Sequence, residues 1–287
     1  MKIYNTSEFS EKLKIKSVNI DDIENMNINN TEIEITVRPT TSSWLKSIIE
    51  ERIKERGSTC NLNDIDVSEI KDMRHLFDHV DFNGVISRWN VSNVTDMSYM
   101  FANSTFNGDI SEWDVSNVTN MTGMFEYSVF NTNISKWNVS SVSNMNLMFS
   151  HSKFNKDISK WNVSNVKNMG HMFNASDFDG DISEWDVSKV EIMSYMFSRS
   201  AFNKPLNNWN TSNVIETFSM FAFSQFNQDI SNWNVSKLEY MDEMFYNSPF
   251  DQDISKWNLL NIKSHKDVFD NCKMYYDLEK QPKQIRE

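Results

Sequence analysis

Residues 89–112 read WNVSNVTDMSYMFANSTFNGDISE, and the chain repeats this 24-residue stretch with an unchanged spacing. The repeat is marked by tryptophans 24 residues apart, at Trp89, Trp113, Trp137, Trp161, Trp185, Trp209, Trp233 and Trp257. One period earlier, Ile65 stands in place of tryptophan and begins a related copy, which makes nine copies in all. We number the tryptophan position 1 and count the copies from the amino terminus. A fixed period of this length predicts a repeat architecture.

Each copy contains two apolar patterns that differ in period. Trp113 and Val115 alternate with polar neighbours, which is the pattern of a strand with one buried face. Val118, Met121 and Met124 follow at intervals of three, which suits a short α- or 3₁₀-helix. The spacing I-x-x-W-x-V also matches that of leucine-rich repeats. The predicted fold is therefore an α/β repeat solenoid, a leucine-rich-repeat-like right-handed coil of nine 24-residue units with a parallel sheet on one side and short helical segments on the other.

The large side chains at the repeated positions are predicted to form the core. Methionine recurs at positions 9 and 12, where its flexible side chain fills gaps between rings. The predicted core residues are Trp89, Trp113, Trp137, Trp161, Trp185, Trp209, Trp233 and Trp257 at position 1, with Phe101, Phe125, Phe149 and Phe173 at position 13.

The two ends of the array differ from its middle, and repeat arrays need such end caps. Residues 1–60 are predicted to form an amino-terminal cap region, with a strand over about 31–37 and a helix over about 42–56. Ser42 or Ser43 can act as the N-cap of that helix, and Gly57 can end it. The repeat array covers 61–280, with the degenerate ninth copy as its carboxyl-terminal cap, and 281–287 form a polar tail.

The motif NVTDMSYMF followed by FNGDISEWDVS resembles the BspA-like bacterial leucine-rich repeat surface proteins, and especially the Mycoplasma-type lipoprotein repeat of unknown function. The resemblance covers residues 61–280. It implies a leucine-rich-repeat solenoid that is often exported, with adhesion or host-protein binding in some relatives. It implies no catalytic residues, because the motif that carries it is structural.

The composition argues against several classes of function. The 40 acidic and 28 basic residues leave a formal net charge of −12, which opposes binding to a nucleic-acid backbone. Two cysteines do not make a disulfide framework. No apolar run approaches the roughly 18 residues of a membrane helix. No signal peptide is visible, so a cytoplasmic location stays open beside the secreted or surface location that the resemblance implies.

Residues with catalytic or metal-binding chemistry do not gather in the sequence. Of the five histidines, only His75 and His79 are close, and no cysteine or carboxylate cluster joins them at ligand spacing. Nucleophile, phosphate-loop, dinucleotide and metalloprotease motifs are missing. We therefore expect no catalytic residue, no metal site and no cofactor, so that the chain is not an enzyme.

The outward positions of the predicted strands, 24, 2 and 4, form a polar strip in which the sign of the charge alternates along the array. Glu112 with Asp114, and Glu184 with Asp186, are acidic pairs separated by lysines. Two interpretations remain open, a solvated face that serves solubility and a partner-binding surface. The predicted strip consists of Arg88, Asn90, Glu112, Asp114, Lys136, Asn138, Lys160, Asn162, Glu184 and Asp186.

These observations predict a non-enzymatic protein-binding repeat module, namely a bacterial surface or secreted adhesin-like protein. The alternative is an intracellular immunity or inhibitor-type binder that occludes a basic partner with its acidic charge. In both cases the partner is another protein, from a host or a bacterium, and we expect the chain itself to be a monomer.

Overall fold

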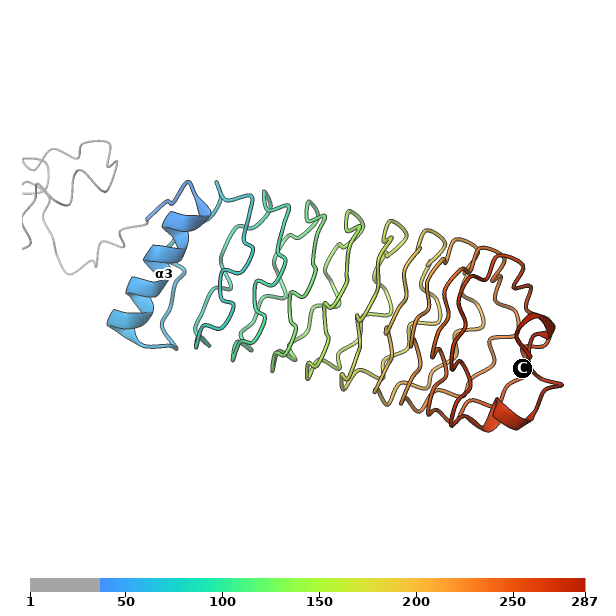
Figure 1. Cartoon of the computed structure of the whole chain (residues 1–287). Helices are drawn as coiled ribbons and strands as arrows, with labels where there is room; N and C mark the ends of the chain where they lie inside the picture. Colours follow the sequence, from blue (N-terminus) through green and yellow to red (C-terminus); the bar gives the residue numbers. More distant parts are fainter. Residues whose placement is uncertain (1–36, 287) are drawn as a thin grey trace, which may run out of the picture. The chain divides into compact units, whose positions relative to one another are not determined.

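The computed structural model describes residues 37–286, in which the copies follow one another as a stack of coils (Figure 1). The helix α3 (Ser42–Arg56) lies at one end of the stack, and the 3₁₀-helices η1 (Lys273–Tyr276) and η2 (Lys283–Ile285) lie at the other. Between them the chain forms turns and isolated parallel bridges. The strand predicted over 31–37 falls outside the described residues except for Val37, which forms a parallel bridge with Ile65.

The predicted α/β architecture, with a parallel sheet on one side and short helices on the other, is wrong. Over residues 37–286 there is no continuous strand, and α3 is the one α-helix. The segment expected to be a strand is closed by turns, since Trp113 donates its backbone N–H to Ile110 and Val118 donates to Val115. Donors used within one copy cannot pair with the next. Parallel bridges recur instead at position 8 of successive copies.

The expected helix is interrupted in every copy by two left-handed residues, at positions 11 and 15. Their φ values lie between 47° and 62°. An α-helix needs right-handed torsions throughout, so this segment forms successive turns. One of these residues is glycine and none is β-branched, in keeping with the sterics of this region. They are His75, Tyr99, Gly123, Leu147, His171, Tyr195, Ser219, Glu243 and Asp267 at position 11, and His79, Asn103, Tyr127, His151, Ala175, Arg199, Phe223, Asn247 and Asn271 at position 15.

A ladder of backbone hydrogen bonds joins each copy to the next. The N–H groups at positions 9, 11, 13 and 15 donate to the carbonyls at positions 8, 10, 12 and 14 of the following copy, over distances of 2.7–3.2 Å. All four bonds are present at each of the eight interfaces between copies. In the third copy, for example, Gly123 donates to Asn146 and Tyr127 donates to Ser150. Every bond of the ladder therefore points its N–H toward the carboxyl-terminal end of the stack.

Aromatic rings stack in three columns inside the coils. Ring centroids are 5.7 Å apart for Phe101 and Phe125 at position 13, 6.0 Å for Phe82 and Phe106 at position 18, and 6.4 Å for Trp89 and Trp113 at position 1. Each indole N–H at position 1 donates to a carbonyl 27 residues earlier, so the polar atom of the buried ring is satisfied. Each of the twelve predicted core residues is at most 5% exposed.

The helix α3 covers the amino-terminal end of the stack with Leu45, Ile48 and Ile49, which are buried. Its N-cap is Thr41, whose side chain accepts the N–H of Trp44, so the expectation of Ser42 or Ser43 as the cap was wrong. Gly57 ends the helix with a φ of 85°. The Ser42 hydroxyl instead donates to the carbonyl of Asp72, at a distance of 2.5 Å. Asp72 is at position 8 of the first copy, where no preceding copy is present to donate a ladder bond to this carbonyl.

Candidate functional site

Position 8 changes character along the stack. In the first five copies it is Asp or Asn, and its side-chain oxygen accepts the backbone N–H of position 10 at 2.8–3.1 Å. This bond forms an Asx turn, which stabilises the local backbone. In the last four copies, all of them within the described range, position 8 is occupied by Ile192, Glu216, Tyr240 and Ser264, which make no such bond. Their identity is therefore not explained by the turn.

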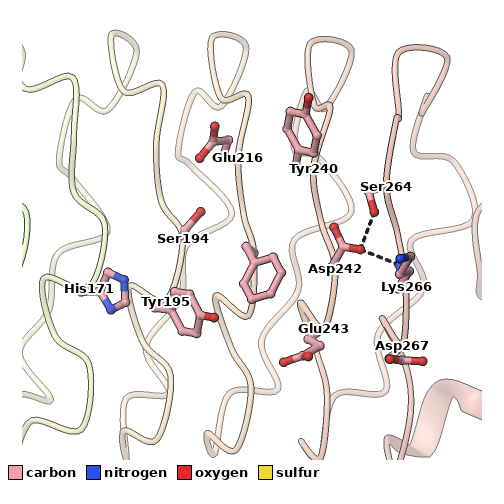
Figure 2. A pocket seen from close by; sticks show the side chains of 11 residues that line it. His171, Ser194, Tyr195, Glu216, Tyr240, Asp242, Glu243, Ser264, Lys266 and Asp267 are labelled. Atoms are coloured by element: carbon pink, nitrogen blue, oxygen red, sulfur yellow. Dashed lines mark hydrogen bonds between the residues drawn. The ribbon is translucent and has the colours of Figure 1, made fainter.

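The surface is hollowed at these four copies. An open groove of about 830 Å³ runs across copies 5 to 9 and is lined by residues at positions 8, 10 and 11. Figure 2 shows that these side chains belong to successive coils. We call it the copy 5–9 groove. It is lined by His171, Ser194, Tyr195, Glu216, Phe218, Tyr240, Asp242, Glu243, Ser264, Lys266 and Asp267.

The groove combines aromatic rings with an excess of carboxylates. Tyr195, Phe218 and Tyr240 supply the rings, and the lining contains four carboxylates and a single lysine, Lys266. Within the lining, Asp242 accepts the Ser264 hydroxyl at 2.5 Å and the backbone N–H of Lys266 at 3.0 Å. These bonds hold one carboxylate in place and leave the groove acidic.

His171 adds no positive charge to the groove at neutral pH. Its ring stacks on Tyr195, with centroids 4.4 Å apart and an angle of 14° between the planes. Burial lowers the pKa of His171, and the neighbouring His151 lowers it further. The neutral form is therefore favoured at neutral pH.

The loss of the Asx turn leaves the Ser194 hydroxyl without a hydrogen-bond partner among the described residues. In the second copy the equivalent serine, Ser98, donates its hydroxyl to Asp96 at 2.6 Å. In the sixth copy Ile192 replaces that acceptor, and the Ser194 oxygen is buried with no hydrogen-bond partner among the described residues. A buried hydroxyl without a partner costs about 1–3 kcal/mol. A ligand group that reached this atom would recover that free energy.

All ten residues of the predicted strip are exposed, but half of them have a local role. The position-2 side chains accept the N–H of the serine at position 4, at 3.0–3.2 Å, and so form turns. These are Asn90, Asp114, Asn138, Asn162 and Asp186. At position 24, Lys136 pairs with Glu112 at 3.0 Å. An ion pair this exposed contributes about 0–1 kcal/mol. A binding role for the strip stays a prediction.

The strip and the groove use different positions of the repeat, so the groove was not predicted from the sequence. A readable signal was present, because position 8 leaves the Asp/Asn pattern at Ile192 and does not return to it in the copies that follow. The histidines near the amino terminus are paired locally, with His75 Nδ1 2.8 Å from an Asp78 oxygen. Across residues 37–286, no three His, Cys, Asp or Glu side chains are grouped so that they could hold a metal ion.

Both cysteines are free and buried, and burial raises the pKa of the Cys60 and Cys272 thiols. None of the helices in the described range has the length and apolar character needed to cross a membrane. Both observations concern the coil stack and its caps, and neither adds a residue to the groove.

Comparison with known proteins gives one match. A family model described as "Mycoplasma protein of unknown function, DUF285" matches the chain three times, at residues 49–151, 126–201 and 174–280. The matched segments overlap and together include α3 in part and all nine copies. No curated protein and no solved structure matches the chain.

Proposed function

Because this chain belongs to the DUF285 family of Mycoplasma proteins of unknown function, we propose that it is a non-enzymatic repeat protein that binds another protein through the copy 5–9 groove. The observation that carries the proposal is the loss of the Asx turns over four consecutive copies, at the place where the surface is hollowed. Residues that stabilise turns elsewhere are replaced in three of these copies by side chains that line the groove, Glu216, Tyr240 and Ser264.

The form of the groove favours a macromolecule over a small ligand. It is open and receives side chains from five successive coils, whereas sites for small molecules enclose most of the ligand surface. Its rings also fit a protein partner, because Tyr and other aromatic residues are enriched where interfaces are most strongly stabilised. Repeat proteins commonly bind along such extended surfaces.

The charge of the groove favours a basic partner. The lining contains Glu216, Asp242, Glu243 and Asp267 but one lysine, and the whole chain carries a formal charge of −12. At the rim, Lys263 lies 5.8 Å from the centroid of the Tyr240 ring, so this ring already accepts a cation on its face. Electrostatic complementarity of this kind accelerates association and selects partners.

We place the protein at the bacterial surface or outside the cell, on the strength of the resemblance to BspA-like surface proteins. The acidic groove equally suits the alternative, an intracellular inhibitor that covers a basic protein. Treatment of intact cells with a protease distinguishes the two, since a surface protein is digested while cytoplasmic proteins are spared. Survival of the chain until the cells are lysed would contradict the surface location.

The binding site is tested by returning the groove to the pattern of the earlier copies. In the triple groove variant, Glu216→Asn with Phe218→Thr and Tyr240→Asn, positions 8 and 10 take the residues that form Asx turns in the third copy. We expect folding to be retained and association with the native partner to weaken at least tenfold. The partner is found by placing a photo-crosslinking amino acid at position 218 or 240 in producing cells and identifying the adduct.

The control reverses four charges of the predicted strip, Glu112→Lys, Lys136→Glu, Lys160→Glu and Glu184→Lys. All four side chains are exposed, so this variant should also fold. We expect it to bind as the wild type does. Adducts formed from strip positions and not from groove positions, with binding lost in the strip variant alone, would move the site to the strip.

A further inference from the structure

The carboxyl-terminal end of the ladder is open. The last copy presents the backbone N–H groups of His265, Asp267, Phe269 and Asn271 at positions 9, 11, 13 and 15, and these groups have no hydrogen-bond partner in the described part of the chain. Because all ladder bonds run in one direction, these four donors point the same way. Backbone donors are normally paired or hydrated in folded proteins.

In the other eight copies the equivalent N–H groups are all paired. At every interior interface they donate to the carbonyls of alternate residues in the next copy, as when Phe245 donates to Val268 and Asn247 donates to Asp270. The four donors at this end are thus equivalent to those of an interface that the fold repeats eight times, and the described residues that follow the last coil do not pair with them.

A pocket lies beside the four donors. It has a volume of about 270 Å³ and is formed by the last coil together with the residues that follow it, up to η2. Its lining includes Tyr275, Tyr276 and Leu278, which are 49%, 89% and 46% exposed. Apolar side chains grouped in this way, next to unfilled backbone donors, are a feature of surfaces that accept an added strand.

We infer that this end binds a segment of a partner polypeptide that winds as the coils of this chain do, so that its alternate carbonyls accept the four N–H groups and an apolar side chain enters the pocket. As in strand addition, backbone bonds would supply affinity and a pocket would supply selectivity. A free anion is disfavoured, because the carboxylates of Asp267 and Asp270 flank the donors. A second copy of the chain is disfavoured because its complementary carbonyl end lies under α3, where Ser42 already pairs with Asp72.

The test measures amide hydrogen exchange in the full chain, with and without a blocked synthetic peptide. The probe is VSNMNLMFSHS, the sequence of residues 142–152, whose carbonyls accept the ladder of the third copy in the chain itself. We expect the amides of His265, Asp267, Phe269 and Asn271 to exchange at least tenfold more slowly when the peptide is bound. The amides of the eighth copy at the same positions are already bonded, so their exchange should not change.

Two leucines of the last copy and its cap make a matched pair of variants. Leu278→Ala removes a pocket side chain and should weaken peptide binding about tenfold, while Leu260→Ala removes a more exposed leucine outside the pocket and should leave it unchanged. The triple groove variant should also bind the peptide normally, so the two sites can fail independently. Failure of the peptide to bind, equal binding of a scrambled peptide, or self-association of the chain that Leu278→Ala abolishes would each overturn the inference.

Discussion

Ala175 shows how strongly the neighbouring copies determine the backbone at a single residue. Its φ is 49°, and its N–H donates to Ser198 in the following copy at 2.8 Å. A side chain with a Cβ disfavours this left-handed region by about 1–2 kcal/mol. Seventeen of the eighteen left-handed residues at positions 11 and 15 have a Cβ and therefore carry this cost. Ladder bonds and core packing on both sides of each coil offset it.

Replacing Ala175 by glycine should therefore stabilise the protein, by about 0.5–1 kcal/mol in the free energy of unfolding, because it removes the steric cost. Ala102 is the matched control, since it lies at position 14 and is not among the residues with positive φ. There the same substitution should destabilise by about 1 kcal/mol. Urea unfolding of both variants measures the difference. Changes of the same sign would show that the left-handed torsions carry no cost.

Trp161 and Asn162 are adjacent but lie on opposite sides of the coil. Trp161→Ala removes a ring that is 3% exposed and should destabilise by about 3–5 kcal/mol. Asn162 is exposed, yet it accepts the N–H and the hydroxyl of Ser164 at 3.2 Å and 2.7 Å. Asn162→Ala should therefore destabilise by about 0.5–1 kcal/mol, like the loss of other local caps. Thermal melts that ranked Asn162→Ala as the more harmful change would contradict this assignment.

At the scale of the element, burial was readable from the sequence and backbone pairing was not. Alternation at Trp113 and Val115 shows which side chains point inward, but turns and strands both satisfy that pattern. The three-residue spacing after Val118 likewise fits a helix or a series of turns. The left-handed residues at positions 11 and 15 exclude the helix and leave the series of turns. They are hard to predict from the sequence, because glycine is the residue that usually indicates a left-handed backbone, whereas position 11 holds residues such as Tyr99 and Leu147. The helix over Ser42–Arg56 has ordinary capping residues and lies where they place it.

The Asp-Ile-Ser turns should make the stack sensitive to acid. At position 21, Asp109, Asp157, Asp181, Asp229 and Asp253 accept hydrogen bonds from the serine two residues later, which lower the pKa of each carboxyl. A pKa that is lower in the folded state than in the unfolded state gives stability that is present above about pH 4 and is lost as the pH falls further.

Replacing these five aspartates by asparagine should flatten the loss of stability below about pH 4, because an amide does not titrate there. The third copy supports the choice, since Asn133 already stands at position 21 and accepts the N–H of Ser135 at 2.9 Å. Urea midpoints recorded from about pH 7 down to about pH 2 measure the effect. An unchanged acid slope in the five-fold variant would assign the acid sensitivity to other carboxylates.

At the scale of the whole molecule, each copy contacts mainly its two neighbours, so whole copies should be removable. Deleting residues 113–136 brings Met97 next to Asn144, which is the same ladder pairing with the same register. We expect the shortened chain to fold with a lower urea midpoint and to keep binding through the copy 5–9 groove. Deleting only residues 113–124, half a copy, should unfold it, because the register is lost. Equal tolerance of both deletions, judged by circular dichroism, would contradict a register set by the ladder.

The one-way ladder also has a mechanical consequence. A force that separates the two ends of the stack loads the interfaces in series, and each interface is held by the four ladder bonds together with a backbone bond between residues at position 7. The weakest one should yield first and release a single coil, whose 24 residues extend to about 80 Å at roughly 3.4 Å per residue. The remaining coils would stay wound, so the chain would lengthen in steps under load and limit the tension that reaches any attachment at its ends.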